Sequence, residues 1–416
     1  MSSVAGTPDE SSRKQARPVH AWRELWLITI GHGLTHWYPA TFYLLLPLIG
    51  HELGLTYSQI GLIMTCQYVA SAIANVPGGI LVDTVGRKGL LMAVSLFWVG
   101  FPYLLISFTH SYAMLLLCIG LVGFGNSLWH PTAIPTLGSR YPDRKGLVLS
   151  LHGMGGNVGD AIAPVVIGAS LAYFSWRQVV VMNVAPGLVV AALMLAFLGT
   201  MRLGAKKHQH EGQSFAEYVK GLRLLFANRS LILLSTGSSF RTMTQTALLT
   251  FLPVYLANAM GYSPAVVGAC LFALQAAGFA AAPVAGHLSD RMGRKNILMS
   301  AMLSSAVVLV LMAVMGGSPV FVALVAVLGF FLYATRPVIQ AWLLDSTPKN
   351  MGGSSIGVLF GAQAVGASLG PLFGGMVADR WGLLATFYFL AFTIVIANLL
   401  VFWIPKVDAP AAGSAA

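Results

Sequence analysis

Charged residues are scarce in this chain of 416 residues, where Asp, Glu, Lys and Arg together make up 9%. Soluble globular domains carry about 25% of these residues. Hydrophobic residues reach 56%, which is more than the core of a soluble fold of this length can bury. The apolar runs are continuous and do not alternate with polar residues, which excludes a β-barrel. The composition therefore predicts a membrane protein with helical spans, which satisfy their own backbone hydrogen bonds in lipid.

Cysteine is also scarce, since Cys66, Cys118 and Cys270 are the three in the chain. They lie in apolar segments without metal-ligand spacing, so neither a disulfide framework nor a zinc site is expected. The chain lacks a nucleotide-binding loop and a nucleophile constellation, and His32 and His36 lack the Glu of a zinc-protease motif. No apolar segment with a cleavage site marks a removable signal peptide. We expect no enzyme, no metal and no cofactor.

Twelve apolar segments long enough to cross a bilayer follow one another along the chain. They are 25–50, 58–81, 89–109, 112–138, 146–174, 178–200, 230–258, 263–286, 296–316, 319–345, 354–377 and 383–404. A polar stretch with apolar residues at helical spacing, predicting an interfacial helix, divides them into two groups of six. The expected parts are a tail at 1–24, a six-helix bundle at 25–200, this linker at 201–229, a second bundle at 230–404 and a tail at 405–416.

The basic residues are distributed unevenly between the two sides of these spans. If the N-terminus is cytoplasmic, the segments on that side hold twenty of the 24 Lys and Arg residues. The opposite loops hold two, Arg177 and Arg380. The positive-inside rule then predicts a multi-pass protein of the inner (plasma) membrane with both termini in the cytoplasm. The net charge of +11 reflects this topology, so we expect a lipid-embedded monomer and no nucleic-acid partner.

Two sequence patterns occur once in each group of spans. The motif G-x-x-x-D-x-x-G-R-K at 79–88 recurs at 286–295, an offset of 207 residues. Gly, Pro and Gly at 159–168 recur with the same spacing and offset at 366–375. Because each half holds an even number of spans, the halves are parallel repeats related by an axis along the membrane normal. A binding site is expected at their midplane interface.

The doubled loop motif resembles the major facilitator superfamily, and the resemblance covers nearly the whole chain. It implies an all-α membrane fold of twelve transmembrane helices in two six-helix parallel repeats. It also implies that Asp83, Arg87, Asp290 and Arg294 hold one gating state, with a solvated tight turn as the structural alternative. The glycine-proline pattern at 366–375 matches a motif of drug antiporters in this superfamily, although close helix packing explains it better.

Ionisable side chains within spans cost about 2.5–3.5 kcal/mol each to insert, so they require an explanation. The first, fourth, seventh and tenth spans each carry two polar residues at i and i+4, on one helix face. The pairs are His32 with His36, Asn126 with His130, Arg241 with Gln245, and Arg336 with Gln340. In the superfamily these spans line the central cavity. The fifth span adds Asp160, the one acid expected at mid-span, and His152, which we interpret as structural.

Arg241 and Arg336 cannot lose their charge, and Asp160 alone cannot neutralise both. At least one arginine is therefore expected to face a watery cavity and bind an anion, because guanidinium matches carboxylate, phosphate or phosphonate. The expected substrate-binding residues are Arg241, Arg336, His36, His130, Asn126, Gln245, Gln340 and the aromatic Trp129. Hydrogen bonding between helices is the alternative for the amides, and packing is the alternative for Trp129. Asp160, His32 and His36 are the expected proton carriers, since histidine titrates near pH 6.5.

Within the superfamily, the chain is most similar to the fosmidomycin-resistance-like exporters. The similarity is carried by Gly31-His32, by 123–131 (GFGNSLWHP), by 155–159 (GGNVG), and by Arg241 followed by 251–255 (FLPVY). Relatives often have an acid where this chain has His36, and a small residue where it has Asp160. Compared with those relatives, the carboxylate lies on the fifth span instead of the first, so we do not infer the substrate from the resemblance.

The sequence predicts a secondary transporter that works by alternating access. Its expected activity is proton-coupled export of a small anionic or amphipathic compound, such as a drug or a phosphonate. Proton-coupled uptake of an organic anion is the alternative, because the sequence does not separate the two directions. A transport-dead sensor or a membrane enzyme is the less favoured class.

Overall fold

The computed structural model describes residues 20–199, 223, 225–347 and 352–405. The expected interfacial helix of the linker and most of the two expected tails lie outside the described residues. Within the described ranges the chain forms helices and no strands, which confirms the all-helical expectation.

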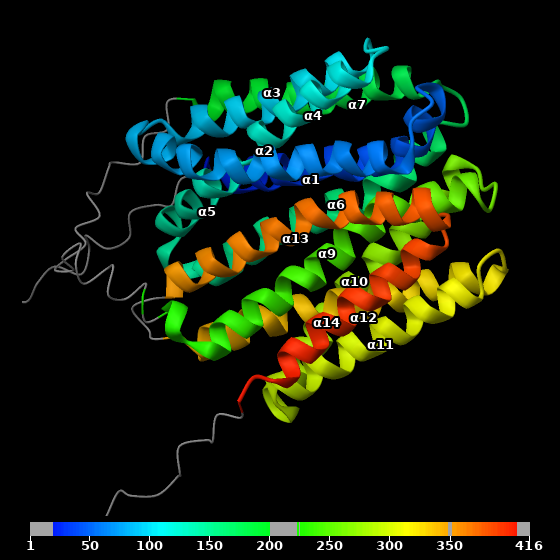
Figure 1. Ribbon diagram of the computed structural model, residues 1–416. Coiled ribbons are helices and arrows are strands. Elements are labelled where there is room, and N and C mark those ends of the chain that lie inside the picture. Colours follow the sequence, from blue (N-terminus) through cyan, green and yellow to red (C-terminus); the bar gives the residue numbers. More distant parts are fainter. Residues whose placement is uncertain (1–19, 200–222, 224, 348–351, 406–416) are drawn as a thin grey trace, which may run out of the picture.

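Each expected span corresponds to helical structure (Figure 1). The N-terminal half contains α1 (His20–Glu52), α2 (Tyr57–Thr84), α3 (Lys88–Ile106), α4 (Tyr112–Asn126), α5 (Trp129–Arg140), α6 (Lys145–Ser170) and α7 (Trp176–Leu198), with a 3₁₀ turn at Pro142–Arg144. The C-terminal half contains α9 (Arg229–Asn258), α10 (Pro264–Met292), α11 (Arg294–Val314), α12 (Pro319–Asp345), α13 (Gly352–Trp381) and α14 (Ala385–Phe402).

The expected span at 112–138 differs from the others because it consists of two helices, α4 and α5, with a break at Ser127. Pro131 lacks the N–H that would bond to the carbonyl of Ser127, and its ring crowds that turn. The carbonyl of Gly125 accepts a hydrogen bond from the Ser95 hydroxyl of α3 at 2.9 Å. A proline effect and a tertiary hydrogen bond therefore interrupt the helix.

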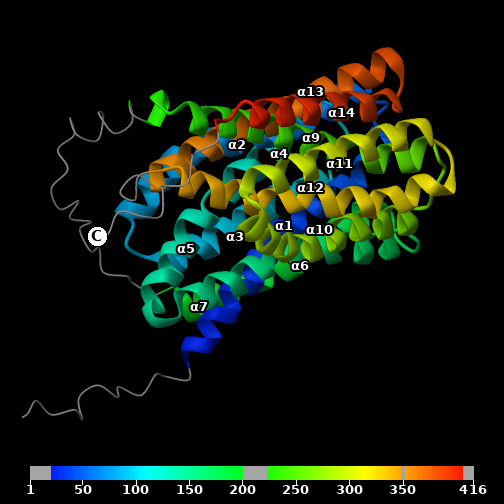
Figure 2. The ribbon, with the colours of Figure 1, turned by 90° about the horizontal axis from the view of Figure 1, so that it is seen from below.

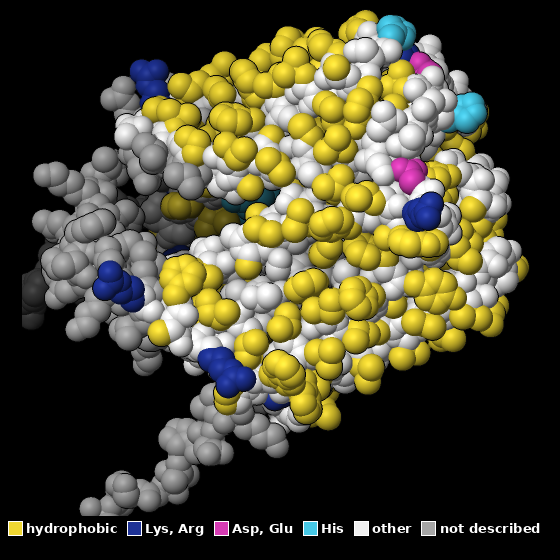
Figure 3. All heavy atoms as spheres, viewed as in Figure 1, with side chains coloured by type: hydrophobic (Ala, Val, Ile, Leu, Met, Phe, Trp, Pro, Cys, Tyr) yellow, Lys and Arg dark blue, Asp and Glu magenta, His cyan; other side chains and the backbone are white. Residues whose placement is uncertain are grey.

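Among the described residues, eight helical segments are long and apolar enough to cross a membrane. They are α3, α4 joined with α5, α7, α10, α11, α12, α13 and α14. Figure 3 shows hydrophobic side chains over the middle of the molecule and charged side chains towards its two ends. The other long helices are α1, α2, α6 and α9, and three of them carry ionisable side chains at mid-helix.

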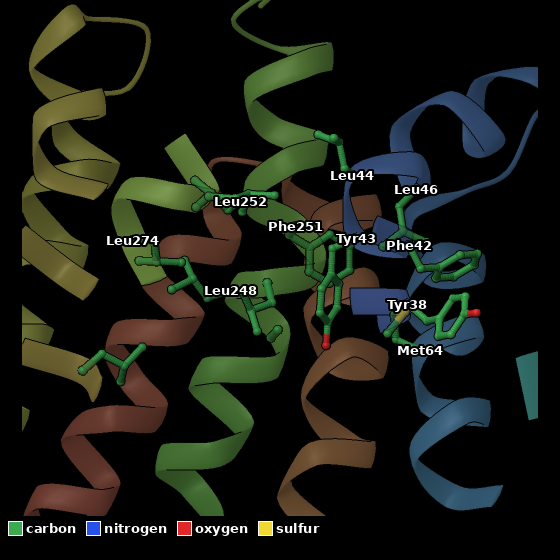
Figure 4. Packing of buried hydrophobic residues seen from close by; sticks show 14 of the residues in the cluster. Tyr38, Phe42, Tyr43, Leu44, Leu46, Met64, Leu248, Phe251, Leu252 and Leu274 are labelled. Atoms are coloured by element: carbon green, nitrogen blue, oxygen red, sulfur yellow. The ribbon is translucent and has the colours of Figure 1, made fainter. Parts of the chain in front are cut away.

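The two halves meet along three helix pairs: α2 with α13, α6 with α10, and α1 with α9 (Figures 1 and 2). The buried core is continuous across this boundary, because Tyr43 of α1 and Phe251 of α9 belong to one cluster (Figure 4). Unlike the six helices of these pairs, α5 and α12 make their main contacts within their own halves. Figure 3 shows the surface hollowed between the halves, with a histidine side chain in its depth.

The halves touch through backbone at the end of the molecule that carries the loop between α1 and α2, which we call the closed end. A Cβ added to Gly61 of α2 would lie 2.1 Å from the carbonyl oxygen of Pro371 in α13. A Cβ on Gly268 of α10 would lie 2.1 Å from the carbonyl oxygen of Pro164 in α6. Glycine is required at both contacts, because any side chain would separate the helices. The opposite end, which carries the loops α2–α3 and α10–α11, is called the motif end.

A carboxylate of one half caps a helix of the other at the closed end. Asp379 of α13 accepts the backbone N–H groups of Tyr57 at 2.8 Å and Ser58 at 2.9 Å, in the first turn of α2. Both bonds run from backbone N–H donors of the N-terminal half to a carboxylate of the C-terminal half. Negative charge at a helix N-terminus is also favourable. The ionised carboxylate therefore stabilises the contact between the halves.

Replacing Asp379 with Ala removes this cap, which should cost about 1 kcal/mol and increase the population that is open at the closed end. Asp379→Asn keeps an acceptor oxygen and should have a smaller effect. Spin labels at the exposed Tyr173 and Trp381, one in each half, would report the change as longer distances.

An unchanged distance distribution in Asp379→Ala would contradict the assigned role.

Candidate functional site

Ionisable side chains from both halves converge in the interior of the helix bundle. The N-terminal half supplies His32 and His36 on α1, His130 on α5, and His152 and Asp160 on α6, while the C-terminal half supplies Arg241 on α9 and Arg336 on α12. Lipid would leave such groups without partners, so they are stable only between helices or in water. Their contacts with one another decide what the cavity can bind.

His32 is buried and makes two contacts that determine which of its ring nitrogens carries a proton. Its Nδ1 lies 2.6 Å from the backbone carbonyl oxygen of His152, and its Nε2 lies 3.1 Å from Nε2 of His130. A carbonyl only accepts, so Nδ1 of His32 is the donor. The neutral His32 ring then presents a lone pair at Nε2 towards His130. With this tautomer, Nε2–H of His130 donates the hydrogen bond to Nε2 of His32.

His36 and Asp160 form a second pair, between α1 and α6. Nδ1 of His36 lies 2.9 Å from Oδ2 of Asp160, and the two side chains are 28% and 30% exposed. This exposure means that water reaches the pair. A carboxylate next to an imidazole can exchange a proton with that water, so the pair is able to take part in proton transfer.

His152 belongs to the same cluster, although the sequence analysis interpreted it as structural. Its ring stacks on that of His32, with centroids 4.0 Å apart and planes 12° apart. Both of its ring nitrogens are buried without a hydrogen-bond partner in the part of the chain that the structure describes. The available signal was spacing, because His152, Gly156 and Asp160 recur every four residues on one face of α6.

Gly156 provides the space for these imidazoles. A Cβ at this position would lie 2.8 Å from Cε1 of His32 and 3.0 Å from Cδ2 of His36. The first distance is shorter than real Cβ contacts and the second is tighter than most, so the absence of a side chain on α6 allows both rings to pack against it. Gly153, one turn earlier, has no atom within 4 Å of the corresponding position.

Arg241 is buried and bound entirely to neutral groups. Its Nε donates to Thr335 Oγ1 at 2.9 Å, and its Nη2 donates to the Leu332 carbonyl at 2.9 Å. Its Nη1 donates to Gln245 Oε1. Its guanidinium carbon lies 5.9 Å from the centroid of the Tyr333 ring. These acceptors hold the guanidinium between α9 and α12 without neutralising it, so Arg241 places a fixed positive charge beside the cavity.

Arg336 is in the opposite situation. Its side chain is exposed, and it forms no hydrogen bond or ion pair with the described residues. It lies close enough to His130 of the other half and to Arg241 for their charges to interact. Of the two arginines expected to bind an anion, Arg336 is therefore the exposed one and Arg241 is the buried one.

The other expected substrate-binding residues are divided between the cavity and the core. His130 is exposed, and Gln340 is half-buried one turn after Arg336. Oδ1 of Asn126 is buried without a partner in the described ranges. Trp129 is fully buried, and a Cβ on Gly31 would lie 2.4 Å from its ring, so its indole belongs to the core and not to the cavity wall.

The structure describes three of the four expected gating side chains in the loops of the motif end. Arg294 pairs with Asp290 at 2.5 Å and, through Nε, with Asp345 of α12 at 3.1 Å, so it joins elements of the C-terminal half. Arg87 is exposed at the start of α3. The side chain of Asp83 lies outside the described part of the chain. The gating role of these four residues remains a prediction.

Comparison with known proteins identifies the family. The family model of the Major Facilitator Superfamily matches residues 25–279 and 234–416. The hexuronate transporter of Bacillus subtilis (strain 168) is 26% identical over 359 residues, covering 83% of this chain and 85% of that protein. The fosmidomycin resistance protein of Escherichia coli (strain K12) is 24% identical over 380 residues, covering 90% and 91%.

A solved structure with the same fold is that of a bacterial homolog of the human lysosomal transporter Spinster, in an inward-facing and unoccupied conformation. Its TM-score is 0.78 at 17% identity, covering 92% of this chain and 98% of that one.

Because the family model matches most of its length, the chain belongs to the Major Facilitator Superfamily, a family of transporters and not of enzymes. With its many apolar helices it is a multi-pass protein of the inner membrane.

The packing at Gly156 predicts opposite effects for two glycine substitutions one turn apart. Gly156→Ala forces the rings of His32 and His36 to move and should cost about 1–3 kcal/mol of stability, as overpacking does. Gly153→Ala meets no atom and should be neutral or stabilise the helix by up to about 1 kcal/mol. Thermal unfolding in detergent measures both. Equal melting temperatures for the two variants would show that the imidazoles do not need this space.

Proposed function

We propose that this member of the Major Facilitator Superfamily exports a small anionic or amphipathic compound in exchange for protons, by alternating access. The observation that carries the proposal is Arg336, an exposed guanidinium at mid-helix with no partner among the described residues. An unpaired charge at this depth is costly unless water or an anionic ligand solvates it. Arg336 faces the half that holds the His36–Asp160 pair.

The anion-binding face is formed by α12. Guanidinium can bind a carboxylate, phosphate or phosphonate through two parallel hydrogen bonds. Gln340 follows Arg336 by one helical turn and can hydrogen-bond the same ligand. Arg241 adds a second positive charge, held between α9 and α12 by neutral acceptors. His130 approaches from the opposite half.

Two relatives support an anionic substrate through their names. One is named for hexuronate, a carboxylate, and the other for resistance to fosmidomycin, a phosphonate. The second name also favours export. Uptake of an organic anion with protons is the alternative, because the first name does not state a direction.

Proton exchange is assigned to the opposite half. The His36–Asp160 pair is reached by water, and the buried His32 is hydrogen-bonded to His130, which is exposed. With a negative cell interior, moving one anionic charge outward gains about 2.3 kcal/mol per 100 mV, and inward movement of a proton gains a similar electrical term. Export of an anion against entry of a proton is thus driven by both components of the proton gradient.

Alternating access is assigned to the boundary between the halves. If the positive-inside rule places the motif end in the cytoplasm, the conformation is closed to the outside and open to the cytoplasm. The glycine contacts and Asp379 then close the outer side. The loop residues Asp83, Arg87, Asp290 and Arg294 are proposed to stabilise the alternative state, in which the motif end closes.

Arg336→Gln should raise the KM for an anionic substrate at least about 10-fold, because it removes a charge-assisted hydrogen bond worth roughly 1.5–3 kcal/mol. Arg336→Lys keeps the charge without the planar fork and should give an intermediate value. Transport into vesicles, with phosphonates and simple carboxylates as substrates, measures this. Arg23→Gln, which removes an exposed charge at the start of α1, is the control. Wild-type KM values in Arg336→Gln would remove the anion site.

Asp160→Asn should abolish proton-driven transport while leaving exchange of substrate across the membrane in the absence of a gradient. The reason is that the amide cannot carry the proton but preserves the shape of the side chain. Proteoliposomes with an imposed pH gradient separate the two activities. Proton-driven accumulation by the variant would exclude Asp160 as the coupling group, and accumulation on the cytoplasmic side by the wild type would replace export with uptake.

A further inference from the structure

We propose that His32, His36 and His130 together bind one divalent transition-metal ion of the Zn²⁺, Co²⁺ and Ni²⁺ class. The proposal goes beyond the transport function, and it differs from the sequence analysis, which expected no metal. Spacing along the chain did not suggest it, because the fold brings His130 of α5 to the two histidines of α1.

The first argument is the distance between the ligand atoms. One ring nitrogen from each of the three histidines lies within 4.8 Å of the other two. Nε2 of His32 and Nε2 of His130 are 3.1 Å apart. Zinc binds histidine nitrogen at about 2.0–2.1 Å in tetrahedral sites, which separates two ligand nitrogens by about 3.3 Å. Small rotations of the rings therefore bring all three nitrogens to one ion.

The second argument is that two of the rings are already oriented as metal ligands are. Nδ1 of His32 donates to the backbone carbonyl of His152, and Nδ1 of His36 is bonded to the carboxylate of Asp160. A histidine that binds a metal almost always donates its other ring N–H to a carbonyl or a carboxylate. Both contacts leave Nε2 unprotonated in the neutral ring, as the metal requires.

The third argument concerns space and access. Gly156 lets the rings of His32 and His36 approach α6 without a clash. His130 is exposed, so an ion reaches the site through the cavity. Three protein ligands leave the fourth tetrahedral position open to water or to an anion.

The local charges favour an ion that binds imidazole strongly. Asp160 contributes a negative charge beside His36, but Arg336 places a positive charge near His130. Mg²⁺ and Ca²⁺ prefer oxygen ligands and gain little from three imidazoles. Zn²⁺, Co²⁺ and Ni²⁺ bind imidazole well enough to offset the nearby arginine.

The test uses full-length protein without an affinity tag, purified in detergent and titrated with Co²⁺. We expect one Co²⁺ per chain with the intense visible absorption of tetrahedral coordination, displaced by an equal amount of Zn²⁺. His130→Gln should lose this absorption. Asp160→Asn, which changes the partner of His36, should weaken binding about 10-fold to 100-fold. His287→Gln, which changes an exposed histidine outside the cluster, should bind as the wild type does.

The wild-type titration decides the matter even if a variant fails to fold. Absence of tetrahedral absorption, or an octahedral spectrum, would overturn the proposal, as would full binding by a folded His130→Gln. A chelator in the assay buffer removes the metal ion, so anion transport is measured without it. Loss of the metal site with normal anion transport would therefore refute this inference alone, and metal binding without transport would refute the proposed function alone.

Discussion

Charge in a hydrocarbon environment must be solvated, and this requirement organises the interior of the molecule. The exterior meets it by carrying almost no charge at mid-membrane depth, with large apolar side chains facing outward. The interior meets it in two ways. Arg241 is surrounded by hydroxyl, amide and carbonyl acceptors, whereas Arg336 lies exposed between the halves. The cavity exists because groups such as Arg336 and His130 need water or a ligand.

Much of the fold follows from the sequence because its signals are local or repeated. Apolar length marks the spans, and the motif at 79–88 and 286–295 marks the two halves. The two members of each polar pair at i and i+4 share a helix face, since a helix has 3.6 residues per turn. His36 lies on the polar face of α1 that this periodicity predicts, and the structure joins it to Asp160 of α6 at 2.9 Å.

The details that the sequence could not reveal depend on neighbours distant in the chain. Trp129 lies on a polar stretch, yet Gly31 admits its ring into the core. Arg241 and Arg336 have the same local pattern, but Arg241 is buried and donates to Thr335 and Leu332 of α12, whereas Arg336 is exposed. The spacing on α6 places His152 on the same face as Asp160, but its stacking on His32 depends on how α1 packs against α6, which that spacing does not reveal.

The glycine contacts at the closed end determine how the halves can separate. Gly61 and Gly268 rest directly on backbone carbonyls of the other half, so these surfaces contain few side-chain rotamers that must rearrange when they part. The two halves can therefore separate and pack together again in the same register. A methyl group added at Gly61 or Gly268 would keep the helices apart and prevent the closed end from closing fully.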